Sequence, residues 1–194
     1  MLRYFIINKP FQVLSQFSRE GDKATLADVY AFPKDVYPVG RLDYDSEGLL
    51  ILTNDTSLNH RLLDPSHSHE REYWVQVEGE PTAEALQRLS KGVDISINGK
   101  VHHTQPAKAQ LLDNPSVPDR NPPIRYRANI PTTWISLSLT EGKNRQVRRM
   151  TAAVGFPTLR LIRHRIKKLM LQDIQPGEVR ELSGTEIKAL LFGK

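Results

Sequence analysis

The sequence contains no cysteine. This absence excludes a disulfide scaffold, a thiolate zinc site, an iron–sulfur cluster and a cysteine nucleophile. Long apolar runs are also absent: no run, Leu49–Leu52 included, exceeds four residues, whereas a membrane-spanning helix needs about 20. The apolar stretch at the N-terminus is too short for a signal-peptide core, and no small-residue cleavage site follows it. We therefore expect a cytoplasmic protein that does not enter the membrane.

The histidines do not form a recognisable metal site. There are six, and four of them form the short groups His67-Ser68-His69 and His102-His103. Neither group has the spacing of a helical zinc pair, and no third ligand is evident. The sequence therefore predicts that no metal is bound.

Positive charge is concentrated in one part of the chain. The 194 residues carry a net charge of +5, but the segment from Arg120 to Lys168 has twelve lysines and arginines and a single acid, Glu141. That segment carries +11 and the rest of the chain −6. So polarised a distribution favours an anionic partner, nucleic acid above all, over a merely solvated basic face.

The hydrophobic pattern predicts more strands than helices. Alternating or continuous apolar runs predict strands at 4–7, 49–53, 73–78, 134–140 and 158–166, the fourth with one solvent-exposed face. Short helices are expected near 25–30, at 57–63, after Thr82 and after Ser183. Residues 113–131 contain five prolines and predict a long loop, which in a compact chain is usually functional. Because strands and helices do not alternate regularly, the fold class is α+β with mainly antiparallel sheet.

A basic helix is predicted between Gly142 and Gly155, with Asn144 as its N-cap. Its apolar face would hold Val147, Met150 and Val154, and its opposite face Arg145, Arg148 and Arg149. Three arginines in the first turns repel one another and are disfavoured by the helix dipole. Their placement favours contact with phosphate or with an internal carboxylate over a solvent-exposed basic surface.

The most polar stretch lies between Gly40 and Asp55. Positions 1, 3, 5 and 6 of a calcium loop would be Asp43, Asp45, Glu47 and Gly48, but position 12 holds Asn54 in place of the bidentate glutamate, and a strand follows where a helix is required. Calcium binding is therefore rejected. Two hypotheses remain open from spacing alone: a working carboxylate at Asp43 kept ionised beside Arg41, or a solvated acidic turn.

Five stretches, taken in order, resemble the pseudouridine synthases of the RsuA/RluB/RluE/RluF group. Motif I is matched by Asn8-Lys9-Pro10, and motif II by Gly40-Arg41-Leu42-Asp43 followed by Gly48-Leu49-Leu50. The tyrosine strand is matched by Arg71-Glu72-Tyr73-Trp74-Val75, motif III by Glu141–Met150, and the family's C-terminal stretch by Pro176–Leu182. Residues 120–125 and 131–134 are most similar to a member of the group that acts on large-subunit ribosomal RNA. The chain departs from the pattern at three places: Arg71 replaces a lysine, the pair Lys167-Lys168 stands where relatives tend to carry a glycine, and Val179 replaces a common tryptophan.

The resemblance implies one catalytic domain over residues 1–194, built of two subdomains or lobes around a central cleft. Many relatives begin with an S4 RNA-binding domain, whereas this chain opens at the motif I strand. We therefore expect no S4 domain, and RNA binding by the catalytic domain itself.

The implied reaction isomerises uridine in RNA without a cofactor. Asp43 would be the catalytic carboxylate, adding to the base, adding to the sugar carbon or promoting a glycal route. Arg148 is our choice for the basic residue of motif III that pairs with Asp43, and Arg145 and Lys143 are the alternatives. Tyr73 would stack on the base and serve as a proton acceptor. Leu50 and Val147 would pack around the pocket. The target base has to leave its stack to reach the carboxylate, so base flipping is expected.

The resemblance also identifies a partner, ribosomal RNA, with 23S rRNA favoured. Residues expected to bind RNA are Arg41, Lys143, Arg145, Arg149, Arg125 and Arg127. We expect a monomer. The alternatives are the same chemistry on 16S rRNA or tRNA, or a non-catalytic rRNA-binding or ribosome assembly factor.

Overall fold

The computed structural model describes residues 1–193 and divides into two compact units. The first unit combines Met1–His69 with Ile162–Lys194, and the second is Glu70–Leu161. Strand β11 (Thr158–Ile166) begins in the second unit and ends in the first. The first unit is therefore assembled from the two ends of the chain, whereas the second is one continuous segment.

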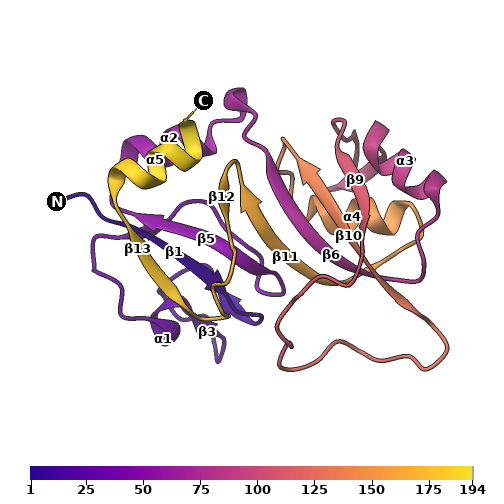
Figure 1. The fold of residues 1–194 in the computed structure, drawn as a ribbon, viewed down its shortest axis with the longest axis horizontal. Helices are drawn as coiled ribbons and strands as arrows, with labels where there is room; N and C mark the ends of the chain where they lie inside the picture. The colour runs from indigo at the N-terminus through magenta and orange to yellow at the C-terminus, as the bar shows by residue number, and fades with distance from the viewer. Residues whose placement is uncertain (194) are drawn as a thin grey trace. The chain divides into compact units, whose positions relative to one another are not determined.

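The first unit is built on a sheet in the order β13-β1-β5-β11, and β4 and β12 add to β5 and β11 (Figure 1). β1 is antiparallel to β13 and β5, and β5 is parallel to β11. The short strands β2 and β3 form a separate parallel pair. The elements are β1 (Tyr4–Lys9), β2 (Val13–Leu14), β3 (Ala24–Thr25), α1 (Leu26–Val29), β4 (Tyr37–Pro38), β5 (Glu47–Thr53), α2 (Thr56–Leu63), η1 (Pro65–His67), β12 (Leu169–Met170), β13 (Val179–Leu182) and α5 (Gly184–Phe192).

Alternating side chains of β1 and β5 form the core of the first unit. Phe5 and Ile7 on β1 pack with Leu50 and Leu52 on β5 and with Leu26 of α1. Strands buried on both faces read as continuous apolar runs, which is the pattern that the sequence shows here.

Helices α2 and α5 lie side by side in Figure 1. The Arg61 guanidinium of α2 lies 3.9 Å from the centre of the Phe192 ring of α5. Helix α5 starts at the predicted cap, because Ser183 Oγ accepts a hydrogen bond from the Glu186 amide at 3.1 Å. The contact between Arg61 and Phe192 connects the C-terminal helix α5 to α2 of the N-terminal segment.

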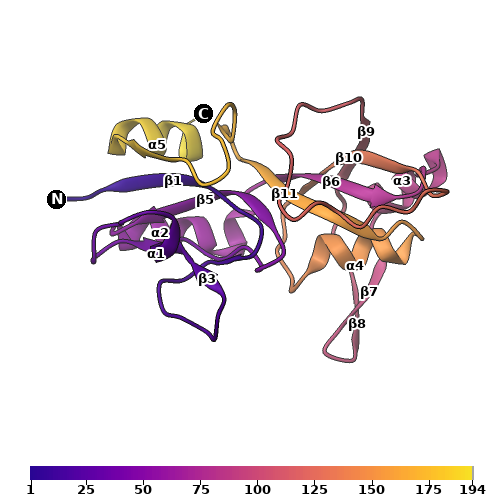
Figure 2. The same ribbon diagram turned by 90° about the horizontal axis from the view of Figure 1, so that it is seen from below.

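The second unit has an antiparallel sheet in the order β6-β10-β9, a hairpin of β7 and β8, and two helices. Helix α4 lies along one face of β6 and β10 (Figure 2), and its buried side chains join one apolar cluster with theirs. The elements are β6 (Arg71–Glu78), α3 (Ala83–Lys91), β7 (Asp94–Ile97), β8 (Lys100–His103), β9 (Lys108–Leu112), β10 (Thr132–Leu139) and α4 (Gln146–Ala153).

The predicted fold class, α+β with mainly antiparallel pairing, is confirmed, and each predicted strand is present. Two details were wrong. The serine face of β10 is not wet, because Ser136 is buried and its Oγ donates to Glu72 Oε1 at 3.0 Å. The basic helix is shorter than predicted and spans Gln146–Ala153.

Within residues 1–193, no helix combines the length and the apolar character needed to cross a membrane.

Candidate functional site

Asp43 is held in a turn whose backbone is fixed on both sides. Ser15 Oγ accepts from the Leu42 amide at 3.1 Å and donates to the Leu42 carbonyl at 2.8 Å. After Asp43, the Ser46 amide donates to the Asp43 carbonyl at 3.0 Å. Leu42 itself is buried, and Asp43 is half-buried. The carboxylate therefore projects from a rigid part of the first unit, as a reacting group must.

Gly48 marks the end of this turn, where three strands meet. It pairs with Lys9 of β1 on one side and with Arg163 of β11 on the other. Its backbone has φ +108°, and a Cβ at this position would lie 2.4 Å from the Arg163 carbonyl oxygen. Only glycine fits this geometry without displacing β11.

Lys9 of motif I is buried beside the Asp43 turn, with no exposed surface. Its Nζ donates to the carbonyl oxygens of Pro10 at 2.9 Å and Val13 at 2.7 Å. Burial lowers the pKa of Lys9 to about 7; Arg163 acts in the same direction, and the carboxylates of Glu47, Asp45 and Asp43 act in the opposite direction. No pattern in the sequence predicts a role for Lys9.

The buried lysine predicts a specific pH dependence of stability. Between pH 7 and pH 9 the unfolded chain binds more protons at Lys9 than the folded chain, because the pKa is about 7 when folded and about 10.4 when unfolded. The free energy of unfolding should therefore rise with pH in this window, by up to about 1.4 kcal/mol per pH unit. Urea denaturation at several pH values measures the rise.

The variant Lys9→Met should lose this rise, since it removes the titrating group. Lys34, an exposed lysine, provides the control: Lys34→Met should keep the wild-type slope. Equal slopes for wild type and Lys9→Met would show that Lys9 titrates normally in the folded state.

Arg41 precedes the Asp43 turn. Its side chain is exposed, and its Nη2 donates to Gln16 Oε1 at 3.3 Å. The hypothesis that Arg41 lies beside the Asp43 carboxylate stays a prediction. RNA contact by Arg41 stays a prediction.

In the second unit, Tyr73 and the motif III helix share one apolar cluster. Tyr73 lies on β6 opposite Leu137 of β10 and packs half-buried against that cluster. Val147 and Met150 of α4 are buried in it. Val147 and Leu50, both predicted to pack around a pocket, belong to the cores of the two different units.

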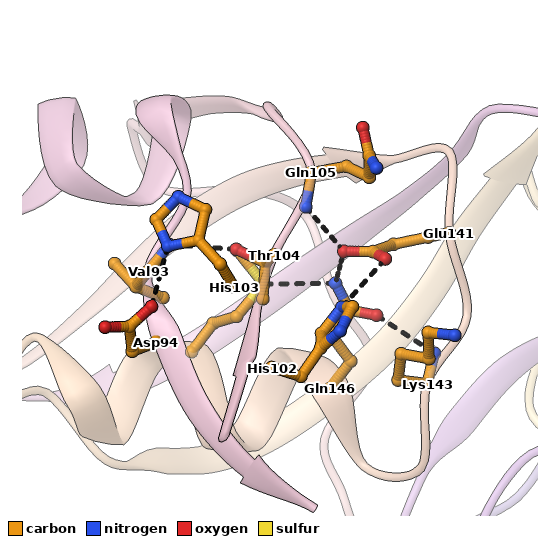
Figure 3. Close-up of polar contacts among 10 residues, drawn as sticks. Val93, Asp94, His102, His103, Thr104, Gln105, Glu141, Lys143 and Gln146 are labelled. Atoms are coloured by element: carbon orange, nitrogen blue, oxygen red, sulfur yellow. Dashed lines mark hydrogen bonds and ion pairs between the residues drawn. The ribbon is translucent and has the colours of Figure 1, made fainter. Parts of the chain in front are cut away.

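Glu141 organises the loop that leads into α4 (Figure 3). Its carboxylate accepts from the Gln105 amide at 2.7 Å, from Gln146 Nε2 at 2.7 Å and from His102 Nε2 at 3.1 Å. Gln146 Oε1 in turn accepts from the Lys143 amide at 2.9 Å. Burial raises the pKa of Glu141, but these hydrogen bonds outweigh burial and hold the pKa below its usual value. The loop is thus fixed by an ionised acid.

The predicted N-cap of α4 was wrong. The cap is Arg145, in the left-handed region at φ 50°, and its side chain makes no capping hydrogen bond. Asn144 instead accepts from Arg149, at its carbonyl oxygen (3.0 Å) and at Oδ1 (3.2 Å). Arg149 Nη1 also donates to the Ser96 carbonyl at 2.6 Å. Arg149 therefore ties the motif III loop to β7.

The predicted site residues are divided between the two units. Asp43, Arg41 and Leu50 belong to the first unit, and Tyr73, Arg125, Arg127, Lys143, Arg145, Val147, Arg148 and Arg149 to the second. Lys143, Arg145 and Arg125 are exposed, and Arg148 is half-buried. Arg127 Nη1 lies 3.1 Å from Glu78 Oε1. Pairing of Arg148 and Tyr73 with Asp43 stays a prediction.

The histidines of the two short groups contact carboxylate and carbonyl oxygens of the protein. His102 contacts Glu141, His103 Nδ1 lies 2.7 Å from Asp94 Oδ1 (Figure 3), and His69 Nε2 lies 2.9 Å from the Arg61 carbonyl oxygen. Over residues 1–193, no three histidine or acidic side chains converge as metal ligands would.

Comparison with known proteins gives consistent matches. The family model described as RNA pseudouridylate synthase matches residues 3–153, a range that holds Asp43, Tyr73 and Arg148. The chain is 50% identical over 180 residues to "Ribosomal large subunit pseudouridine synthase E" of Vibrio parahaemolyticus, covering 93% of this chain and 74% of the relative. The protein of the same name from Xanthomonas axonopodis pv. citri is 52% identical over 174 residues, which cover 88% of this chain and 89% of the relative.

Solved structures agree in fold. A crystal structure of a pseudouridylate synthase superimposes with a TM-score of 0.79 at 28% identity, covering 98% of this chain and 74% of that one. The matched family range and the identity of the relatives confirm the resemblance drawn from the motifs. The chain belongs to the RNA pseudouridylate synthase family.

Proposed function

We propose that this protein converts a specific uridine of 23S ribosomal RNA to pseudouridine. The observation that carries the proposal is its 50% and 52% identity to relatives named ribosomal large subunit pseudouridine synthase E. The reaction breaks the bond between N1 of uracil and C1′ of the ribose, turns the base and joins C5 to C1′. C5 loses a proton and N1 gains one, so the reaction is an isomerisation without net oxidation.

Asp43 is the proposed catalytic carboxylate. Its turn is fixed by Ser15 and Ser46, which supports a role that needs accurate placement. Arg148 would keep the carboxylate ionised through a charge-assisted hydrogen bond. Tyr73 would stack on the flipped base and take up a proton. Lys143 and Arg145, exposed at the start of α4, would contact RNA phosphates.

Release of tritium tests the proposal directly. A 23S rRNA transcript carrying 5-tritiated uridine should lose one tritium per modified site, because the C5 proton leaves in the reaction. Release from 16S rRNA or tRNA instead would redirect the proposal to another RNA. Binding of 23S rRNA with no release from any of the three would favour the non-catalytic assembly factor.

We also propose that the protein works as a monomer in the cytoplasm, where ribosomal RNA is transcribed and modified in bacteria such as those of its relatives. Light scattering should give a mass near 22.1 kDa, and a dimer mass would contradict the proposal.

Neutralising Arg125 and Arg127 should weaken RNA binding and flatten its salt dependence. Each phosphate contact that is lost lowers the slope of log Kd against log salt by about 1. Since Arg127 already pairs with Glu78, Arg125→Ala should account for most of the change. Binding titrations at four salt concentrations provide the measurement, and an unchanged slope in the double variant would count against phosphate contact by the loop.

A further inference from the structure

The long loop between β9 and β10, residues 113–131, is here called the arm (Figure 1). It is anchored to the second unit at two places: Arg120 Nη1 donates to the Leu159 carbonyl oxygen at 3.4 Å, and Arg127 Nη1 to Glu78 Oε1 at 3.1 Å. Its five prolines further limit the conformations that it can adopt. The arm is therefore a supported element rather than a free chain.

Two adjacent side chains of the arm take no part in this anchoring. Tyr126 is 85% exposed, and within residues 1–193 it makes no hydrogen bond, ring–ring contact or cation–π contact. Arg125 is also exposed, and over the same residues its guanidinium makes no ion pair or hydrogen bond. A ring this exposed leaves its face open to stack on a ligand.

The ring lies beside a depression in a basic part of the chain. Residues 124–132 line an open depression of about 420 Å³. The arm also belongs to the segment of charge +11. An aromatic face beside an uncommitted guanidinium matches a base and its phosphate, whereas a protein partner would have to neutralise this charge.

We propose that Tyr126 is a stacking platform for an unpaired RNA base and that Arg125 holds the adjoining phosphate. The inference rests on the proposed function, since it assumes an RNA substrate, and it adds a second contact point outside the catalytic residues. A base that stacks on the ring has to lie outside a duplex, because inside a duplex both of its faces are covered by the neighbouring stacked bases. The arm would thus recognise single-stranded RNA next to the modified site.

Three variants of the intact protein test the inference by fluorescence binding to a 12-nucleotide oligouridine and to a 12-base-pair RNA duplex. Tyr126→Ala should bind the single strand about 5- to 100-fold more weakly with an unchanged salt slope. Tyr126→Phe, which keeps the ring, should bind like wild type. Tyr37→Ala removes a tyrosine that is 58% exposed outside the arm and should have no effect, and duplex binding should be the same in all three variants.

Wild-type binding of the single strand by Tyr126→Ala would overturn the inference, and so would an equal loss on strand and duplex. Tritium release by the wild-type protein is measured in parallel. If wild type releases tritium and Tyr126→Ala binds normally, only the inference fails. If no release occurs while Tyr126→Ala still weakens binding, the proposed catalysis fails and the stacking site stands.

Discussion

Replacing Asp43 with asparagine is expected to lower tritium release from 23S rRNA by at least about 1,000-fold. The substitution keeps the size of the side chain but removes its negative charge, and single replacements of a reacting group commonly cost this much. The backbone hydrogen bonds of Leu42 and Ser46 hold the turn without the carboxylate. Folding and RNA affinity should therefore stay close to wild type, as thermal unfolding and binding titrations would show.

Asp45→Asn is the matched control for this experiment. Asp45 lies in the same turn and is half-buried like Asp43, so its replacement removes the same charge from the same place. We expect activity within about tenfold of wild type, because Asp45 does not match the motif aspartate. Equal losses in the two variants would mean that the charge of the turn, and not the Asp43 carboxylate, is what the reaction needs.

Replacing Gly48 with alanine is expected to destabilise the fold by about 3–5 kcal/mol. The new Cβ would lie 2.4 Å from the Arg163 carbonyl oxygen and 2.7 Å from the Arg163 amide nitrogen, so β5 and β11 would have to separate. The φ of +108° adds strain that a side chain does not tolerate. Denaturant titration measures the loss of free energy of unfolding.

The variant Gly21→Ala separates the effect of the steric clash from the effect of the positive φ. The φ of Gly21 is also positive, at +58°, but a Cβ there would meet nothing within 4 Å. Gly21→Ala should therefore cost only about 1 kcal/mol, the conformational contribution. If the two alanine variants were equally stable, the close approach of β11 would not be what requires glycine at position 48.

Much of the fold was readable because local signals and tertiary structure agree. The runs at 49–53 and 158–166 and the caps at Thr82 and Ser183 each specify an element from their own residues. The failures have tertiary causes. Strand β13 has only four residues and exists because β1 pairs with it. The buried serine face of β10 depends on Glu72 of the neighbouring strand, which no pattern within β10 reveals.

The candidate site was less predictable from residue patterns than the fold. Asp43, Tyr73 and Arg148 were assigned by resemblance to a family, whereas spacing alone left Asp43 between a working carboxylate and an acidic turn. Glu141 was missed, although it is the single acid in the segment of charge +11. The burial of Lys9 could not be inferred locally, since Lys9 pairs with Gly48 of β5, about forty residues further along the chain.

The order of the two units along the chain affects how the protein is made. Glu70–Leu161 is one continuous segment, so the ribosome has delivered all of it before synthesis ends. The other unit cannot be completed until its last strand emerges, because β1 pairs with β13 from Val179 to Leu182. Contacts so distant in sequence close slowly, and domains otherwise tend to fold in order of synthesis. Strand β1 can therefore pair with β5 early in synthesis, but it gains its second partner only after β13 has been made.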